Sequence, residues 1–251
     1  MEPVAGLVVV PLGCGGWISN PLLGPTALLV KVGGLGLLLD AGEGVYYALR
    51  RCGFDVGDVD WVLVTHGHGD HVLGLPTLAL YAKRAGRVLK VAGPPSVDTI
   101  KLLKAAGIPH YADAVSFKLV EPSPEPSLVL EEKDVRVYAG AADHGVPAVA
   151  YRVEAGELAV AYSGDTRPCE SVVRLARGCK LLIHEASISF DGERAHAHGH
   201  STAVDAVEAA KAAGVKYLMP VHFYVEPAVI PTGVKIVIPI PCTPLDVEAL
   251  P

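Results

Sequence analysis

One short segment of this sequence concentrates residues that bind metal ions. Thr65-His66-Gly67-His68-Gly69-Asp70-His71 places imidazoles and a carboxylate side by side, directly after apolar residues 61–64. Neutral imidazole and carboxylate are good ligands for zinc and similar divalent ions. The two glycines let the backbone curl, so that His66 and His68 can face one ion while Asp70 and His71 face another. A histidine-rich surface loop is the alternative, which the position after a buried strand disfavours.

Further candidate ligands lie near the ends of other predicted strands: His144, Asp165 and His222. Each follows an apolar run, at residues 135–139, 158–162 and 217–221 respectively. A single residue of this kind is more often a turn cap or a satisfied buried group. Together they supply the imidazoles and the bridging carboxylate of a two-metal site, in which ions about 3.5–4 Å apart share an activated water and stabilise both the attacking and the leaving oxygen.

The elements that must position these residues follow from apolar periodicity. Short apolar runs alternate with alanine-rich helical stretches, as is typical of layered α/β proteins. We predict strands at residues 7–11, 27–32, 35–40, 61–65, 88–92, 128–130, 135–139, 148–153, 158–162, 180–184 and 217–221. We predict helices at residues 43–52, 75–84, 97–106, 170–176 and 202–213. The proline-rich stretch 121–127 is interpreted as a surface loop, so residues 1–251 are predicted to form a single domain.

Composition excludes some classes of function. The net charge of −6 argues against broad electrostatic binding of nucleic acid, although it leaves room for a local basic groove. No apolar run approaches the ~18 residues of a membrane-spanning helix, so we expect no membrane contact. The hydrophobic content of 51% suits either a homodimer or a tightly packed monomer.

Cysteine and amide usage indicate the environment. The 5 cysteines are scattered, are odd in number and form no C-x-x-C, so we predict neither a disulfide framework nor a cysteine zinc site, and we expect a reducing cytoplasm. The chain has no glutamine and a single asparagine, Asn20. Scarcity of thermolabile amides predicts a heat-stable, thermophilic protein.

The order of the motifs resembles the metallo-β-lactamase superfamily, with H-x-H-x-D-H followed by His, Asp and His. Asp40, in the strand-end stretch 39–44, is similar to a superfamily Asp that supports the metal loop from outside. Within the superfamily, four segments resemble ribonuclease Z, the zinc tRNA 3′-processing endonuclease: residues 70–76, Ser163-Gly-Asp-Thr-Arg-Pro168, His184-Glu-Ala-Ser187 and Gly199-His-Ser-Thr202. The resemblance runs from Leu12 to His222. It implies a four-layer αββα sandwich of two mixed sheets, with the metals at one edge.

The resemblance also implies a role for each matched residue. The implied ligands are His66, His68 and His144 for the first metal, Asp70, His71 and His222 for the second, and Asp165 as the bridge. The implied cofactors are two zinc ions, with manganese or iron as alternatives. Asp70 would also orient the attacking hydroxide, while Glu185 would orient His200 so that this imidazole protonates the leaving 3′ oxygen. Structural alternatives are a capping carboxylate for Glu185 and a helix cap for His200.

The chain departs from the ribonuclease Z pattern in the segments that would bind RNA. The family's long flexible arm has no room between His144 and Asp165, which are joined by little more than one hairpin. Basic residues are missing from 17–26, and His222 is followed by Phe-Tyr-Val-Glu226 instead of Ser and a basic-aromatic pair. Candidate replacements for the arm are a partner, a dimer-related surface, and the arginines Arg167, Arg174 and Arg177.

Three functions are therefore compared. The first is a dinuclear zinc phosphodiesterase of the ribonuclease Z type, acting on a phosphodiester substrate such as a tRNA precursor. The second keeps the metal site but hydrolyses a small phosphodiester, thioester, lactone or sulfate ester. The third is a non-catalytic metallo-fold binding subunit. His196 and His198 are interpreted as part of a solvated loop, and His110 receives no role.

Overall fold

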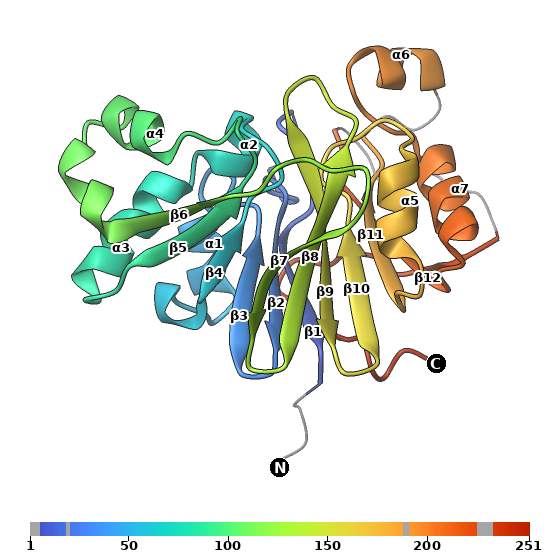
Figure 1. Ribbon diagram of the computed structural model, residues 1–251, viewed down its shortest axis with the longest axis horizontal. Helices are drawn as coiled ribbons and strands as arrows, with labels where there is room; N and C mark the ends of the chain where they lie inside the picture. Colours follow the sequence, from blue (N-terminus) through green and yellow to red (C-terminus); the bar gives the residue numbers. More distant parts are fainter. Residues whose placement is uncertain (1–5, 19–20, 188–190, 225–232) are drawn as a thin grey trace.

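Two sheets face each other in the computed structural model, which describes residues 6–18, 21–187, 191–224 and 233–251 (Figure 1). The first sheet contains β1 (Val8–Gly13), β2 (Ala27–Val32), β3 (Leu35–Leu39), β4 (Trp61–Leu63), β5 (Leu89–Gly93), β6 (Val115–Leu119) and β14 (Leu245–Asp246). The second contains β7 (Ser127–Glu132), β8 (Val135–Ala142), β9 (Ala148–Ala155), β10 (Leu158–Tyr162), β11 (Leu181–Glu185), β12 (Tyr217–Val221) and β13 (Lys235–Ile236).

Both sheets are mixed, as predicted. The spatial order is β14-β1-β2-β3-β4-β5-β6 in the first sheet and β13-β12-β11-β10-β9-β8-β7 in the second. Strands β3 to β6 pair in parallel, as do β10 to β13, whereas β1 to β3 and β7 to β10 pair antiparallel. The carboxyl ends of the parallel strands of each sheet therefore lie at one edge, where α/β proteins place ligand sites.

Helices cover the outer faces and complete the predicted αββα layers (Figure 1). Those of the first half are α1 (Val45–Arg51), α2 (Gly69–Val72), α3 (Leu75–Arg84) and α4 (Thr99–Ala105), with 3₁₀ turns at Val56–Asp58 and Pro109–Ala114. Those of the second half are α5 (Glu170–Ala176), α6 (Gly192–Ala197) and α7 (Ala203–Ala213). Helices α1 and α3 pack on the outer face of the first sheet, and α5 and α7 pack on that of the second.

The strands are apolar throughout because both faces of each sheet are covered. In β2, Leu28 and Val30 point into the layer between the sheets, whereas Leu29 points into the helical layer. Tyr151 and Tyr162 are the largest fully buried side chains of the space between the sheets. This core fixes the two sheets relative to each other and, with them, the loops at their common edge.

The predicted element limits agree well where helix caps or long apolar runs mark them. The limits of α3, α5, β2, β10 and β12 match the predictions. Thr202 and Asp205 form a capping box at the start of α7, and Gly214 ends the helix with a φ of 69°. The proline-rich stretch joins β6 to β7 as a loop. Edge strands β6, β13 and β14 were not predicted, because each is short and buries few of its side chains.

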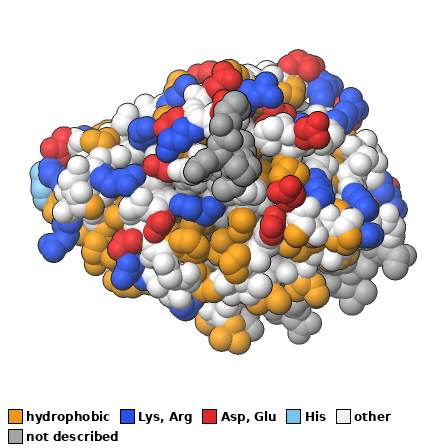
Figure 2. All heavy atoms as spheres, turned by 90° about the horizontal axis from the view of Figure 1, so that it is seen from below, with side chains coloured by type: hydrophobic (Ala, Val, Ile, Leu, Met, Phe, Trp, Pro, Cys, Tyr) orange, Lys and Arg blue, Asp and Glu red, His pale blue; other side chains and the backbone are white. Residues whose placement is uncertain are grey.

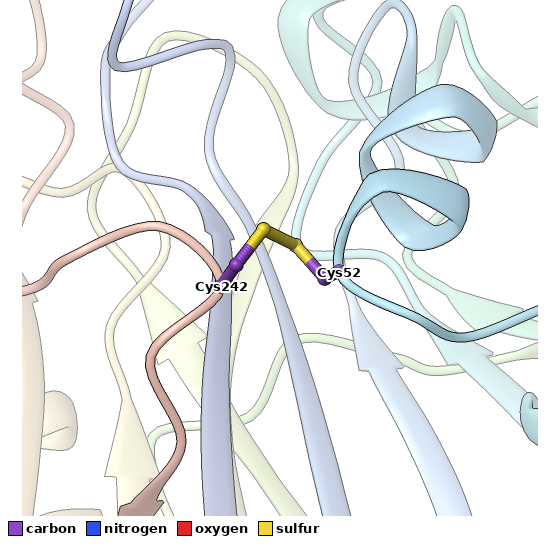
Figure 3. Close-up of a disulfide and its surroundings, with 2 residues drawn as sticks. All are labelled: Cys52 and Cys242. Carbon is purple, nitrogen blue, oxygen red and sulfur yellow. A yellow bond between two sulfur atoms is a disulfide. The ribbon is translucent and has the colours of Figure 1, made fainter.

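The prediction that the cysteines form no disulfide is wrong. Cys52, at the end of α1, is bonded to Cys242 in the C-terminal segment, across a sequence separation of 190 residues (Figure 3). Their Cα atoms lie 4.8 Å apart because the C-terminal segment crosses β1, where the Cys242 amide donates to the Pro11 carbonyl oxygen. Sequence spacing cannot reveal such a pair.

None of the helices in the described ranges combines the length and apolar character of a membrane span.

Candidate metal centre

The candidate ligands converge at the edge where the parallel strands of both sheets end, near α2 in Figure 1. The segment after β4 carries the first four: His66 and His68 lie in the loop, and Asp70 and His71 lie in α2. Loops after β8, β10 and β12 bring His144, Asp165 and His222 to the same place. The structure thus brings together all seven residues that the sequence singled out as ligands.

The first group consists of His66, His68 and His144. The Nδ1 atom of His68 lies 3.0 Å from His66 Nε2 and 3.1 Å from His144 Nε2. Tetrahedral zinc with bonds of about 2.0–2.1 Å separates its ligand nitrogens by about 3.3 Å. Both distances are close to that spacing, and the three ligand atoms all lie within 4.8 Å of one another, so they can surround one ion.

The second group consists of Asp70, His71 and His222. The Nε2 atoms of the two histidines lie 3.4 Å apart, and Asp70 Oδ2 lies 3.5 Å from His71 Nε2 and 3.2 Å from His222 Nε2. All three side chains are buried. Their polar atoms thus converge on a point that water reaches poorly.

Asp165 lies between the two groups. Its Oδ1 atom is 3.4 Å from His71 Nε2 and 3.3 Å from His222 Nε2, whereas its Oδ2 atom is 3.6 Å from His66 Nε2. Oδ1 is buried and has no hydrogen-bond partner among the described residues. A buried carboxylate oxygen without a partner is costly, so this atom fits a site that a cation fills.

In His66, His71, His144 and His222 the other ring nitrogen bonds to a protein group, which orients these imidazoles toward the centre. Thr65 Oγ1 lies 3.1 Å from His66 Nδ1, and Asp40 Oδ2 lies 2.8 Å from His71 Nδ1. The Gly199 carbonyl oxygen lies 2.7 Å from His144 Nδ1, and Ser187 Oγ lies 2.8 Å from His222 Nδ1. Gly199 has a φ of 86°, and a Cβ there would lie 2.8 Å from His144 Nδ1, so glycine permits this contact.

Asp40 supports the ligand loop from beneath, as the resemblance implied. Its carboxylate accepts hydrogen bonds from the Thr65 amide at 2.7 Å and from the Tyr162 hydroxyl at 2.7 Å, in addition to that from His71. Asp40 and His222 both have positive φ, 59° and 64°. Such backbone strain in residues other than glycine concentrates at functional sites.

Burial and neighbouring charges shift the pKa values of the clustered side chains in different directions. Burial, together with the neighbouring His71, lowers the pKa of His66 well below its ordinary value. Burial alone would raise the pKa of Asp165, but the surrounding imidazoles hold it well below its ordinary value. Burial opposes protonation of His71, yet Asp165 and Asp40 raise its pKa well above the usual range. The buried carboxylates therefore favour positive charge at the centre.

Glu185 and His200 lie beside this cluster. Glu185 Oε1 is 3.2 Å from His200 Nδ1 and accepts a hydrogen bond from the Thr166 amide at 2.6 Å. His200 Nδ1 also lies 3.8 Å from Asp165 Oδ2. Burial alone would lower the pKa of His200, but its hydrogen bond to Glu185 and the charge of that carboxylate raise it. The pair thus has the geometry of an oriented acid-base dyad.

Two residues near the dyad received no role from the sequence. Ser187 Oγ donates to Glu185 Oε2 at 2.6 Å and faces His222, so it links the dyad to the second ligand group. The Tyr224 hydroxyl lies 3.1 Å from His200 Nε2. The position of Ser187 within His-Glu-Ala-Ser was the available signal, whereas Tyr224 stands where the chain departs from the family pattern. Val225 and Glu226 lie outside the described residues.

Three other histidines, His110, His196 and His198, lie outside the clusters of candidate ligands. His196 Nε2 pairs with Asp205 Oδ2 at 2.9 Å, and His198 donates from Nδ1 to the Arg194 carbonyl oxygen at 2.8 Å. His110 stacks obliquely on Tyr111. Within the described ranges, none of the three belongs to a cluster of metal-ligating side chains.

The arginines suggested as phosphate contacts are each bound to an acidic side chain. Their partners are Asp143 for Arg167, Glu125 for Arg174 and Glu170 for Arg177. On the face opposite the centre, Lys and Arg side chains also intermingle with Asp and Glu (Figure 2). A groove of about 450 Å³ adjoins the ligand loop at Gly67, and its lining includes Ser96, Asp98 and Lys101.

Comparisons with known proteins agree with this geometry. Residues 36–223 match the family model of the beta-lactamase superfamily domain. The chain is 32% identical to the ribonuclease Z of Ignicoccus hospitalis, over 85% of this chain and 87% of that protein. It is 34% identical to the ribonuclease Z of Pyrobaculum arsenaticum, over 86% of each. The crystal structure of the short form of human tRNase Z superposes with a TM-score of 0.81 at 23% identity, covering 96% of this chain and 99% of that one.

Proposed function

Because this chain belongs to the ribonuclease Z family of the beta-lactamase superfamily, and is a hydrolase of that family, we propose that it removes the 3′ trailer from precursor tRNA. The observation that carries this proposal is the pairing of two converging ligand groups, bridged by Asp165, with the Glu185–His200 dyad. Phosphodiester cleavage requires a strong nucleophile, neutralised charge at phosphorus and a proton for the leaving alkoxide.

The candidate ligands fit two divalent ions, and we propose zinc, with manganese or iron as alternatives. His66, His68 and His144 would hold one ion, Asp70, His71 and His222 the other, and Asp165 both. Such ions, when bound, supply acidified water and charge neutralisation at phosphate. The unpartnered Oδ1 of Asp165 supports this assignment.

The chain's own groups supply orientation and the proton. Asp70 is buried but faces the centre, where its carboxylate can accept a hydrogen bond from the attacking water and orient it. Glu185 holds His200 through Nδ1, which keeps Nε2 directed outward and stabilises the imidazolium. That imidazolium is the source of the proton for the leaving 3′ oxygen.

A small-ester hydrolase is the second candidate, and the absence of a long arm between His144 and Asp165 favours it. Only the antiparallel hairpin of β9 and β10 lies between His144 and Asp165. The nearby arginines are already paired, and the groove beside Gly67 has the size of a small-molecule site. A much higher kcat/KM for a small ester than for RNA would decide for this alternative.

In a homodimer, the second copy could supply an RNA-binding surface in place of the arm. Trp17, Leu22 and Ile238 are exposed by 61%, 82% and 74%, and large exposed apolar side chains suit contact with a second copy. We retain cytoplasmic location and a single domain over residues 1–251 as parts of the proposal.

Cleavage of a precursor tRNA tests the function directly. Metal-loaded protein at elevated temperature should make a single cut after the discriminator nucleotide, mapped at nucleotide resolution. His200→Ala should lower turnover about 10²–10⁴-fold with the metal retained, whereas the matched variant of a remote histidine, His110→Ala, should match wild type. Cleavage of simple phosphodiesters without a cut in the precursor would contradict the tRNA assignment.

A further inference from the structure

Both ring nitrogens of His200 have partners in the protein. Nδ1 lies 3.2 Å from Glu185 Oε1 and 3.3 Å from Ser187 Oγ. Nε2, which would face a phosphate, lies 3.1 Å from the hydroxyl oxygen of Tyr224. The outward edge of the imidazole is therefore covered by a phenol, so an alkoxide could not approach Nε2 without displacing it.

Tyr224 is held in this position by its own chain and by ring packing. Its ring centre lies 5.6 Å from that of His200 and 5.6 Å from that of His222, with the planes nearly perpendicular in both cases. The preceding residue, Phe223, is buried, and its backbone bonds to Cys14 and Gly16 in the segment that follows β1. The phenol is thus anchored between the dyad and a candidate metal ligand.

A phenol at this position can accept one hydrogen bond and donate another, whereas a protonated imidazole can only donate. Its oxygen can accept a hydrogen bond from an imidazolium N–H while its own O–H donates to a third atom. Tyr224 is half-buried, and its contact with His200 Nε2 leaves the phenol O–H available as a donor when that nitrogen is protonated. A substrate oxygen bound at the centre could accept that hydrogen bond.

We propose that Tyr224 is a catalytic residue, which passes the proton of His200 to the leaving oxygen of the substrate. As the bond from phosphorus to the leaving oxygen breaks, its electron pair goes to that oxygen, which takes the proton of the Tyr224 hydroxyl. The Tyr224 oxygen takes the proton of His200 Nε2 in the same step, so the phenol is regenerated and His200 ends neutral. This inference rests on the proposed phosphodiesterase function, and it assigns the group that touches the leaving oxygen to Tyr224.

The dependence of the rate on the leaving group tests the relay. An alkoxide must be protonated as it leaves, whereas p-nitrophenolate is stable without a proton. Tyr224→Phe should therefore lower kcat on RNA about 10²-fold or more with KM nearly unchanged. The same variant should hydrolyse bis(p-nitrophenyl) phosphate within about threefold of wild type, because general-acid catalysis contributes little there.

Control variants separate the relay from a packing role. His200→Ala should show the same leaving-group pattern, and the double variant should be no slower than the slower single variant, because residues of one relay are not additive. Tyr111→Phe removes a phenol remote from the centre and should match wild type on both substrates. Metal content and Tm of Tyr224→Phe should equal those of wild type.

Two results would overturn the proposal. Equal loss on RNA and on bis(p-nitrophenyl) phosphate would show that Tyr224 only shapes the centre, and unchanged kcat on both would show that it takes no part. If wild type does not cut the precursor tRNA, the tRNA assignment fails, but the relay is still tested by the dinucleotide ApU, whose leaving group is also an alkoxide.

Discussion

The two halves of the molecule contribute to the candidate centre in different ways. The first half supplies four of the ligands, His66, His68, Asp70 and His71, from one continuous segment made of the loop after β4 and helix α2. The second half supplies the others from separate loops after β8, β10 and β12, and adds the dyad from β11 and the segment before α7. A local turn can build half of a metal site, but only the packing of two sheets can complete it.

The supports of the two halves differ as well. The ligand loop of the first half rests on Asp40, a fully buried carboxylate that binds Thr65, His71 and Tyr162. The second half relies on neutral groups, the Gly199 carbonyl oxygen and the Ser187 hydroxyl. We therefore expect damage to the first half to appear mainly as lost metal affinity, and damage around the dyad to appear mainly as lost turnover.

Removing the bridge should have the largest effect. Asp165→Asn replaces the one carboxylate that faces both ligand groups, so the imidazoles around it lose their shared negative partner. We expect turnover to fall about 10³-fold or more and metal stoichiometry to fall with it. Steady-state kinetics and elemental analysis on the same preparation measure both. A variant with full metal content and near-normal turnover would refute the bridging role.

Weakening the support of the first half should have a smaller effect. Asp40→Asn removes the charge that orients His71 but keeps the side-chain volume. Metal affinity should fall about 10–100-fold, and added metal should restore most of the turnover. Metal titration against a competing chelator measures the affinity. Ser187→Ala is the matched variant in the second half, and equal losses of affinity in both would remove the proposed difference between the halves.

The disulfide should affect stability and leave chemistry intact. Cys52→Ser opens a link across 190 residues between α1 and the C-terminal segment, so the unfolding free energy should fall by about 2–5 kcal/mol. The Tm should fall by about 2–4 °C for each kcal/mol. Calorimetry with and without reductant measures this, and reductant should not change the Tm of the variant. Turnover below the transition should stay at the wild-type level, and a large loss would link the disulfide to the centre.

The smallest effect is expected at the start of α7. Hydrogen bonds from Thr202 and His196 hold the pKa of Asp205 below its ordinary value, although burial opposes this. The unfolded carboxyl has a pKa of about 3.9, so its stabilisation is fully present above that pH and is lost as pH falls through the lower folded value. Asp205→Ala should cost about 1 kcal/mol at neutral pH and less in acid. Denaturant unfolding at several pH values checks this.

A matched capping box in the first half provides the control for that variant. Asp58→Ala removes the corresponding residue of the box formed by Asp55 and Asp58, far from the dyad. Both variants should lose similar stability, but only Asp205→Ala should also slow turnover, because α7 follows His200 directly. Equal turnover in the two would show that the dyad does not depend on this cap.

The same contrast explains what the sequence could predict. The ligand loop was recognisable because its residues are contiguous and follow an apolar strand. Asp165 and His222 were recognisable only as strand-end residues that became candidate ligands when they were considered together. Their proximity depends on β10 and β12 lying in one parallel sheet. Helix α7 was predictable because its cap and its final glycine are local signals.

What escaped prediction depends on contacts between distant segments. The Cys52–Cys242 bond arises where the C-terminal segment crosses β1, which no spacing rule encodes. Strand β6 was missed because it lies at an edge and exposes Phe117 and Leu119 instead of burying one face. The contact of Tyr224 with His200 joins two loops of the second half, and neither residue predicts the other.

Metal stoichiometry tests most directly whether the two halves form one dinuclear centre. Protein purified without chelator, then loaded with zinc and desalted, should contain two ions per chain by elemental analysis. His144→Ala, which alters only the second half's contribution to the first group, should retain about one ion. One ion or none in the loaded wild-type protein would contradict the account.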